Sequence, residues 1–319
     1  MAFGLRRVEL EEGPATREAF GEALAEVGAD ERLVVIDGDV NNSTYTNKFM
    51  EKYPQRFFNV GIAESNLVGI ASGLAATGKI PVAASFSVFL LANAFDQIRM
   101  SVAFPNMNVK LVGSHAGISI GEDGPSQMAI EDVALACALP GFTVIVPADG
   151  PSAAAATKAM IEREGPTFLR CGRPAVPIIY PDGVDFHLGR ANTLRAGDDV
   201  TVIANGIMVA MALDAAEALA EEGIQVRVLD MHTVKPVDVA AIERAANETK
   251  GIVVAEEHLA YGGLGSVVSM VVAERRPRRM AFVDLGDTYA TSGKPDELLA
   301  QYGLTPDAIA DAARRVLKD

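Results

Sequence analysis

One stretch of the sequence places an ionisable side chain among apolar residues. Between residues 60 and 78 nearly every position is apolar or very small, and Glu64 is the only ionisable residue. This composition predicts a helix from about residue 62 that is buried on all sides. A carboxylate in apolar surroundings must find a partner or take up a proton. Glu64 could therefore exchange a proton with a bound ligand, or it could cap its own helix, because acids favour the first helical turn.

A second candidate group follows an apolar run at residues 109–113, which predicts a strand. His115 comes soon after this run, and a loop with the sequence Gly-Glu-Asp-Gly-Pro follows at residues 121–125. Glycines recur through this segment and allow the tight turns of a loop that lines a ligand. A histidine at a strand end can equally be structural, so both interpretations of His115 stay open at this point.

The elements that must position these residues alternate between strands and helices. Apolar runs typical of buried parallel strands occur at residues 33–37, 81–85, 109–113, 143–147 and 167–171, and then at 200–204, 225–229, 252–255 and 281–285. Helical patterns separate these runs, which predicts an α/β fold with mainly parallel sheets covered on both faces. The first run delivers Asp37, Asp39 and Ser43 to its carboxyl end, where open α/β sheets bind ligands.

Two doubly wound domains are expected. The alternating pattern lapses between Gly172 and Asp198, where three prolines favour a linker. We therefore expect one α/β domain at residues 1–174, a linker at 175–197 and a smaller α/β domain at 198–319. Thr16 is expected to cap a first helix that runs to about Val27.

Composition excludes several classes of function. The 319-residue chain is 49% hydrophobic with a formal net charge of -14, which argues for a globular protein and against nucleic acid or anionic membranes as partners. Cys137 and Cys171 lie in apolar contexts without the spacing of metal ligands, so we expect buried free thiols. We recognise neither a signal peptide nor an uninterrupted apolar run of about 20 residues, and we expect a cytoplasmic enzyme.

Two runs of sequence resemble a known family. Residues 60–66, Val-Gly-Ile-Ala-Glu-Ser-Asn, are similar to the helix of thiamine-diphosphate enzymes that presents a catalytic glutamate to the cofactor's aminopyrimidine ring. Residues 114–127, Ser-His-Ala-Gly-Ile-Ser-Ile-Gly-Glu-Asp-Gly-Pro-Ser-Gln, resemble the more specific transketolase signature. The resemblance runs from about Thr16 to the C-terminus and covers the second half of a full-length transketolase. It implies a pyrimidine-binding domain followed by a transketolase C-terminal domain.

The resemblance implies a role for Glu64 in cofactor activation. A carboxyl group that hydrogen-bonds a pyrimidine nitrogen favours the imino tautomer, whose amino group can then take the proton from the thiazolium carbon. Phe86 and Phe89 fall where the family has an aromatic wall for the pyrimidine, although two such residues alone are more typical of a core. Asp39 is assigned to the same cofactor site.

The resemblance also implies a substrate site. His115 matches a histidine in the substrate channel that contacts the sugar phosphate, and we expect it to be catalytic together with Glu64. Asp123 matches an aspartate that binds a substrate hydroxyl. Arg17 and Arg173, with Ser43 as a weaker third, match phosphate contacts. On their own, the two arginines are more typical of surface salt bridges than of phosphate contacts.

One position departs from the family. Gln127 stands where many microbial transketolases have a second channel histidine. Glutamine can hydrogen-bond a sugar hydroxyl but cannot carry a positive charge or transfer a proton. Donor preference is therefore left open.

A magnesium site is expected elsewhere. The Gly-Asp-Gly motif that holds the diphosphate through a divalent metal is not found, since Gly38-Asp39-Val40 fails at its third position. Magnesium requires hard oxygen ligands in a defined arrangement, so no metal ligand is assigned to this chain. The resemblance then implies a split enzyme, in which an N-terminal subunit holds Mg²⁺ and the diphosphate. We expect two copies of each subunit in a heterotetramer.

The expected activity is transfer of a two-carbon ketol unit from a ketose phosphate to an aldose phosphate, and the chain alone is expected to be inactive. Pentose phosphate interconversion is the commonest family role, but the sequence does not name the sugar. A deoxyxylulose-phosphate synthase-like activity and a 2-oxo acid dehydrogenase beta-like subunit are the enzymatic alternatives. A non-catalytic scaffold subunit is the alternative from another class.

Overall fold

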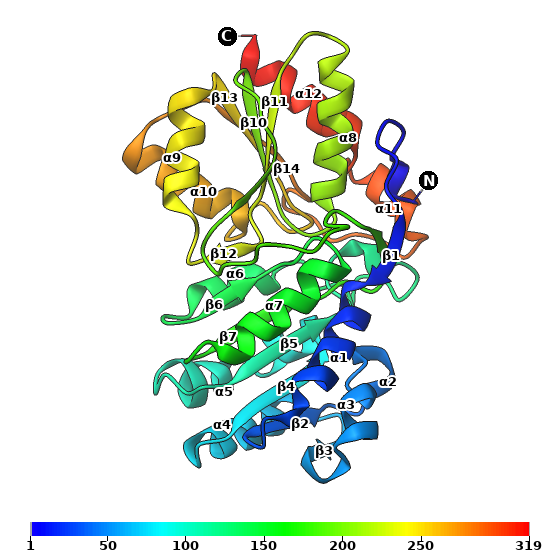
Figure 1. Ribbon diagram of the computed structural model, residues 1–319, viewed down its shortest axis with the longest axis vertical. Coiled ribbons are helices and arrows are strands. Elements are labelled where there is room, and N and C mark those ends of the chain that lie inside the picture. Colours follow the sequence, from blue (N-terminus) through cyan, green and yellow to red (C-terminus); the bar gives the residue numbers. More distant parts are fainter. Residues whose placement is uncertain (1, 319) are drawn as a thin grey trace.

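The computed structural model describes residues 2–318, which form two sheets stacked along the long axis of the molecule (Figure 1). Within these residues the first sheet has seven strands in the order β12-β6-β7-β5-β4-β2-β3, and its pairs are parallel except β12 with β6. Its strands are β2 (Leu33–Asp37), β3 (Phe57–Asn59), β4 (Ile80–Phe86), β5 (Lys110–Ser114), β6 (Thr143–Ile145), β7 (Thr167–Arg170) and β12 (Thr233–Lys235).

In the same described range the second sheet has five strands in the order β14-β13-β10-β11-β9, and its pairs are parallel except β9 with β11. Its strands are β9 (Asn192–Arg195), β10 (Val200–Ala204), β11 (Val226–Asp230), β13 (Gly251–Ala255) and β14 (Met280–Val283). A separate antiparallel pair joins β1 (Glu12–Ala15) to β8 (Ala175–Pro177). The mainly parallel α/β fold predicted from the sequence is confirmed.

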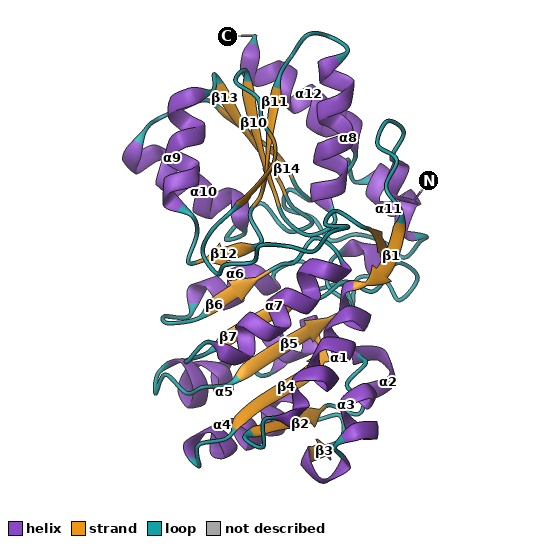
Figure 2. Cartoon of the chain, viewed as in Figure 1, coloured by secondary structure: helices purple, strands orange, loops and turns teal. Residues whose placement is uncertain are grey.

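Helices cover both faces of each sheet (Figure 2). The helices packed with the first sheet are α1 (Thr16–Glu26), α2 (Asn41–Thr44), α3 (Asn47–Lys52), α4 (Glu64–Ala76), α5 (Phe95–Gln97), α6 (Asp132–Ala138) and α7 (Gly150–Glu162). Those packed with the second are α8 (Met208–Ala220), α9 (Val239–Glu248), α10 (Leu264–Arg275), α11 (Pro295–Gln301) and α12 (Pro306–Leu317). Short 3-10 segments are η1 (Ala2–Gly4), η2 (Val27–Ala29), η3 (Pro54–Arg56) and η6 (Ile118–Ile120), and π-helical segments are η4 (Phe89–Asn93) and η5 (Ile98–Ala103).

Strand β2 shows why the central strands are continuously apolar. Its alternate side chains enter two different cores, Leu33 and Val35 on the face of α1 and α7, and Val34 and Ile36 on the face of α4. Cys171 and Cys137 are both free thiols, as expected, but only Cys171 is buried, in the first of these cores, whereas Cys137 is half-buried.

Helix α4 differs from the prediction. It begins at Glu64 rather than residue 62, and one of its faces is exposed, so the expectation of burial on all sides was wrong for this chain alone. The exposed positions are Asn66, Gly69, Ile70, Gly73 and Ala76. Apolar and small residues predict that a surface is covered but not whether the covering residues belong to the same chain. Within residues 2–318 no helix is both long and apolar enough to cross a membrane.

The two sheets are linked by strand pairing and by side-chain contacts, in addition to the covalent connection of the chain. Strand β12 follows β11 of the second sheet but pairs with β6 of the first. The segment 175–197, expected as a linker, contains β8 and β9. A buried arginine, Arg170, binds Asp132 in the first domain and donates through Nη2 to the carbonyl oxygen of Glu257 in the second, at 3.0 Å. These contacts fix the position of the second domain against the loops of the first.

Candidate active site

Glu64 lies at the N-terminus of α4 and faces the end of strand β4. Its side chain is buried, with the residue 7% exposed, and its carboxylate accepts a hydrogen bond from the Ser85 hydroxyl at 2.9 Å. The cap residue of α4 is Ala63, and the hydrogen bond of Glu64 goes to Ser85 rather than to an amide of its own helix. Ser85 therefore orients the carboxylate, which supports a ligand-facing role over helix capping.

Three aromatic rings form a continuous stack next to Ser85. Phe86 and Phe89 have ring centroids 6.2 Å apart and nearly parallel planes. Phe86 also stacks on the His115 ring, with centroids 3.9 Å apart. The candidate cofactor wall and the candidate catalytic histidine are thus in direct contact, which the sequence did not predict.

The hydrogen bonds of His115 define its tautomer. Its Nε2 lies 3.3 Å from Nη1 of Arg17, and its Nδ1 lies 2.9 Å from the Ser114 hydroxyl. Because a guanidinium group has only donors, Nε2 must accept, and Nδ1 then carries the proton and donates to Ser114. Burial, with the positive charges of Arg17 and Arg173, lowers the pKa of His115 to about 3. The ring is therefore neutral near pH 7.

Arg17 connects four segments that are far apart in the sequence. Besides His115, its guanidinium donates to the carbonyl oxygen of Ser43 at 2.8 Å and to that of Arg173 at 3.2 Å, and it lies over the Tyr45 ring at 5.3 Å. These partners follow β5, β2 and β7, so the carboxyl ends of three parallel strands meet at Arg17. We refer to Arg17, Ser43, His115 and Arg173 as the cationic cluster.

The neighbouring threonine has a different role from the one expected. Thr16 was predicted to cap α1, but Ala15 occupies the cap position and Thr16 is the first helical residue. Its hydroxyl instead accepts a hydrogen bond from the amide of Gly172 at 2.8 Å. This contact ties the start of α1 to the segment that carries Arg173, because a hydroxyl can serve a partner outside the helix as well as the helix itself.

Arg173 holds the glycine-rich loop. Its Nη1 donates to the carbonyl oxygen of Ile120 at 2.6 Å and lies 3.3 Å from the Glu122 carboxylate. Asp123 is exposed on this loop and Gln127, which follows it, is half-buried. The structure therefore brings Arg17, Ser43, His115 and Arg173 into one cluster. It leaves Asp123 and Gln127 beside the cluster, outside its hydrogen bonds.

The loop after β2 depends on an aspartate whose role the sequence did not reveal. Asp37 is buried and accepts hydrogen bonds from the Val40 amide and from the hydroxyls of Thr44 and Thr46, at 2.7 to 2.8 Å. Burial raises the pKa of Asp37, and these hydrogen bonds oppose that effect. Asp39 is exposed and accepts from the Asn59 side chain at 2.6 Å. Asp37 was already noted at the end of its apolar run, and polar residues near the carboxyl ends of β4 and β5 were the signal that could have identified Ser85 and Ser114.

Acidic and thiol side chains do not gather into a metal site in the described part of the chain. Across residues 2–318 no group of three or more His, Cys, Asp or Glu side chains is arranged to hold a metal ion. The site itself contains one oriented carboxylate, a stack of rings and the cationic cluster.

Comparison with known proteins identifies relatives over nearly the whole chain. Residues 12–178 match the family model for the transketolase pyrimidine binding domain, and residues 189–309 match that for the transketolase C-terminal domain. A putative transketolase C-terminal section from Methanocaldococcus jannaschii is 40% identical, with 95% of each chain covered. Human transketolase is 43% identical over 95% of this chain, which spans 49% of that protein.

A solved structure and a further relative match with similar coverage. The structure of a split gene transketolase, described as an inactive beta4 tetramer, has a TM-score of 0.90 and 44% identity, with 96% of this chain and 99% of that chain covered. The 6-deoxy-6-sulfo-D-fructose transketolase subunit of a Clostridium species is 40% identical, with 94% of each chain covered.

Proposed function

This chain belongs to the transketolase family as a C-terminal section, and we propose that it is one subunit of a split, thiamine-diphosphate-dependent transketolase. Together with an N-terminal subunit, it transfers a two-carbon ketol unit from a ketose phosphate to an aldose phosphate in the cytoplasm. Such a reaction belongs to carbohydrate metabolism, with pentose phosphate interconversion as the first pathway to test.

The oriented carboxylate of Glu64 carries this proposal. It accepts one hydrogen bond from Ser85, the residue that precedes Phe86 of the aromatic stack in the sequence, and it retains acceptor capacity for a ligand. These residues fit an aminopyrimidine, because a carboxyl group can share a proton with a ring nitrogen while an aromatic ring packs against the ring face. When bound, thiamine diphosphate supplies the nucleophilic carbon that accepts the two-carbon unit.

Phe86 and Phe89 are proposed to have different roles in the site. His115 already covers one face of Phe86, whereas Phe89 lies at the other end of the stack. We assign the pyrimidine wall to Phe89 and the alignment of His115 to Phe86. Asp39, two residues after β2, is proposed to contact the cofactor as well.

The cationic cluster supports an anionic substrate. Arg17 and Arg173 supply fixed donors and positive charge on a chain with a net charge of -14, so the attraction is local. Neutral His115 is proposed to hydrogen-bond the substrate, with Ser43, Asp123 and Gln127 as further contacts. A sulfonate resembles a phosphate ester in being a tetrahedral anion with three terminal oxygens, and the sulfosugar name of one relative makes that donor worth testing.

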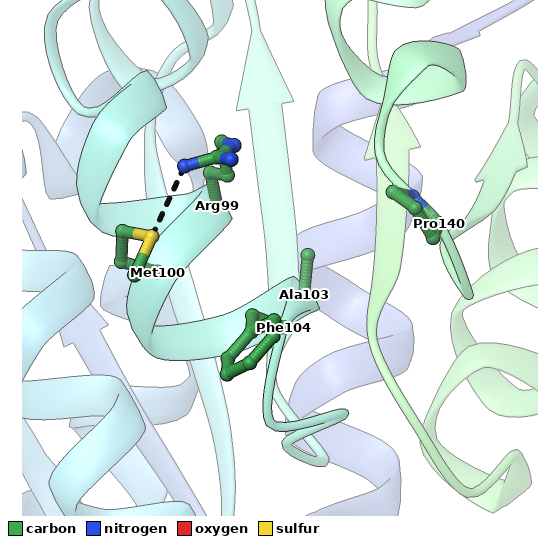
Figure 3. A pocket seen from close by; sticks show the side chains of 5 residues that line it. All are labelled: Arg99, Met100, Ala103, Phe104 and Pro140. Carbon is green, nitrogen blue, oxygen red and sulfur yellow. Dashed lines mark hydrogen bonds between the residues drawn. The ribbon is translucent and has the colours of Figure 1, made fainter.

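The exposed face of α4 supports assembly with a second copy of the chain. The Ser72 hydroxyl of α4 donates to the Ser101 carbonyl oxygen of η5 at 2.6 Å, so the two segments pack together. Ile62, Met100 and Phe104 near this face are 83%, 48% and 84% exposed. Met100 and Phe104 lie on one helical segment and Pro140 on a neighbouring turn (Figure 3). These residues line a hollow of about 220 Å³. Exposed apolar side chains of this size favour an interface.

An N-terminal partner is proposed to complete the site. The chain spans about half the length of human transketolase, and the missing half is proposed to hold Mg²⁺ and the diphosphate. The solved split gene transketolase is an inactive tetramer of beta subunits, which is consistent with a need for the other subunit in that protein. We therefore propose a heterotetramer with two copies of each subunit.

The test is reconstitution with the N-terminal subunit, thiamine diphosphate and Mg²⁺. We expect ketol transfer from a ketose phosphate by the complex and not by either subunit, and a loss of at least about 100-fold in kcat for Glu64→Gln. Glu162→Gln, an exposed glutamate at the end of α7, is the matched control and should retain full activity.

Assaying the reconstituted complex with several donors separates the alternative functions. Transfer from pyruvate, with none from ketose phosphates, would favour a deoxyxylulose-phosphate synthase-like activity. An unchanged KM for a phosphorylated donor in Arg173→Ala would contradict the assignment of the cationic cluster. If the chain binds its N-terminal partner but the complex transfers no ketol unit from any donor, the result would support the scaffold alternative.

A further inference from the structure

The loop that carries His115 and Asp123 is held mainly by contacts with other segments of the chain. Between residues 115 and 124 the backbone has positive φ at His115, Gly117, Gly121 and Gly124, a conformation that glycine adopts readily and that is uncommon for histidine. Its internal hydrogen bonds join Gly121 to Ile118 and Gly124 to Gly121. The remaining contacts come from other segments, and several of these belong to the second domain.

Glu257 of the second domain reaches under the loop. It follows β13, is 5% exposed, and accepts hydrogen bonds from the Ser119 amide at 2.6 Å and the Ser119 hydroxyl at 3.3 Å. Any side chain at Gly117 would overlap the Glu257 carboxylate, so the loop backbone and this carboxylate are in close contact. Burial raises the pKa of Glu257 to about 6, so the carboxylate is mostly ionised at pH 7.5.

The backbone that carries Glu257 is itself fixed. Arg170 binds its carbonyl oxygen, and the next two residues contact the first domain through the Ala134 amide with His258 and the Leu259 amide with Ile130. Glu257 is therefore a rigid support, held where a second-domain strand meets the first domain.

The far end of the loop has a second support. The Ser292 hydroxyl donates to the carbonyl oxygen of Glu122, and Pro295 packs closely against Gly121. Both supports come from the second domain, while Arg173 of the first domain holds Ile120 between them. The loop is thus fixed at both ends by a domain that supplies none of the cationic cluster.

We propose that Glu257 is a positioning residue for substrate binding, through which the C-terminal domain holds the loop of His115 and Asp123 in its binding shape. This inference rests on the proposed function for the substrate itself, but the contact of Glu257 with Ser119 can be tested without any substrate. Loss of the carboxylate leaves a buried amide without its acceptor and frees the loop to move.

Glu256 provides a matched control. It is equally buried, at 2% exposed, but its carboxylate accepts from the amides of Leu264 and Gly265 at the start of α10, within its own domain. Removing either carboxylate leaves buried amides unsatisfied, so both losses should lower stability. Only the loss at Glu257 should affect the loop.

The experiment compares Glu257→Ala, Glu257→Gln and Glu256→Ala in two measurements. In the isolated chain, hydrogen exchange of the amides at residues 117–124 should rise at least about tenfold in Glu257→Ala, as expected for loss of a charge-assisted hydrogen bond. In the reconstituted enzyme, KM for the ketose phosphate should rise by a similar factor, while the affinity for thiamine diphosphate stays within about twofold. Glu257→Gln keeps an acceptor and should restore both values.

The outcomes separate this inference from the proposed function. Glu256→Ala should lower the melting temperature and leave loop exchange and KM near parental values. Equal effects of the two alanine variants on the loop, or no effect of Glu257→Ala on exchange, would overturn the inference. If Glu257→Ala does not fold, Glu257→Asp can replace it, because the shorter side chain keeps the charge but moves it away from Ser119. This variant should also show faster loop exchange and a higher KM. An inactive parental complex would count against the proposed function alone, since the exchange measurement still decides the role of Glu257.

Discussion

The buried ion pair between Arg170 and Asp132 allows a quantitative test of the interdomain contact. Nε of Arg170 lies 3.1 and 2.9 Å from the two Asp132 oxygens, and Nη2 donates at 3.0 Å to the carbonyl oxygens of Ala129 and Glu257. The two side chains are 7% and 1% exposed. Replacement by methionine preserves much of the volume of Arg170 and removes all four hydrogen bonds.

The expected cost follows from what the substitution leaves behind. Asp132 keeps donors from the Ser87 hydroxyl at 2.7 Å and the Val133 amide at 3.0 Å, but it loses its positive partner. Two buried carbonyl oxygens also lose a donor. Removing one partner of a buried ion pair costs about 3 to 5 kcal/mol of the free energy of unfolding, so Arg170→Met should fall in that range.

The assay is urea denaturation followed by far-ultraviolet circular dichroism, because the chain has no tryptophan for fluorescence. With a slope of about 3 kcal/mol per molar urea, the midpoint should fall by about 1 to 1.7 M. The double variant Arg170→Met with Asp132→Asn should lose less than the sum of the two single variants, because the uncompensated charge is gone.

An exposed pair of the same chemistry is the control. Arg32 and Asp30 also make a two-pronged contact, but their side chains are 66% and 30% exposed. Arg32→Met should leave the midpoint unchanged within error, because water replaces the lost contact. A shift for Arg170→Met no larger than that of this control would refute the reasoning that burial makes the contacts of Arg170 matter.

Two further predictions concern histidines and glycines. Burial lowers the pKa of His115 to about 3 and those of His232 and His258 to about 4, so heteronuclear NMR should show all three rings neutral down to about pH 5. The pKa values of these histidines in the folded chain lie below the unfolded value of about 6.5. Their neutral rings therefore contribute fully to stability above about pH 6.5, and this contribution is lost as the pH falls from there towards the folded pKa values. A titration near pH 6 of any of the three rings would contradict the prediction. Gly21→Ala should destabilise the chain by about 1 to 3 kcal/mol despite better helix propensity, because the new methyl group overlaps the Tyr45 carbonyl oxygen. Gly73→Ala on α4, where no atom lies within 4 Å, should be neutral or stabilising in thermal unfolding.

Much of the sheet architecture could be predicted from the sequence. The apolar run at residues 33–37 coincides with β2, and the run at 109–113 overlaps β5, because central parallel strands are apolar on both faces. Strand β12 escaped prediction. It has three residues, and its pairing with a strand of the other sheet is a tertiary contact that no local pattern encodes.

The candidate site was predictable in its residues but not in its contacts. Glu64 and His115 were recognisable because each is a polar residue beside an apolar element. The hydrogen bond from Ser85 and the stacking of Phe86 on His115 depend on side-chain directions at the ends of adjacent strands. The support from Glu257 lies 138 residues from its partner Ser119, so it could be found only in the folded chain.

The crossing of β12 into the first sheet has a consequence for modularity. A fragment that ended in the segment between the two family-model matches would lack β12 and leave the backbone of β6 as an open edge. Unpaired strand edges recruit other chains, so such a fragment would tend to aggregate. Domain-swap chimaeras should therefore transplant both halves together, because a junction after residue 235 would keep β12 with the first sheet but divide the strands of the second.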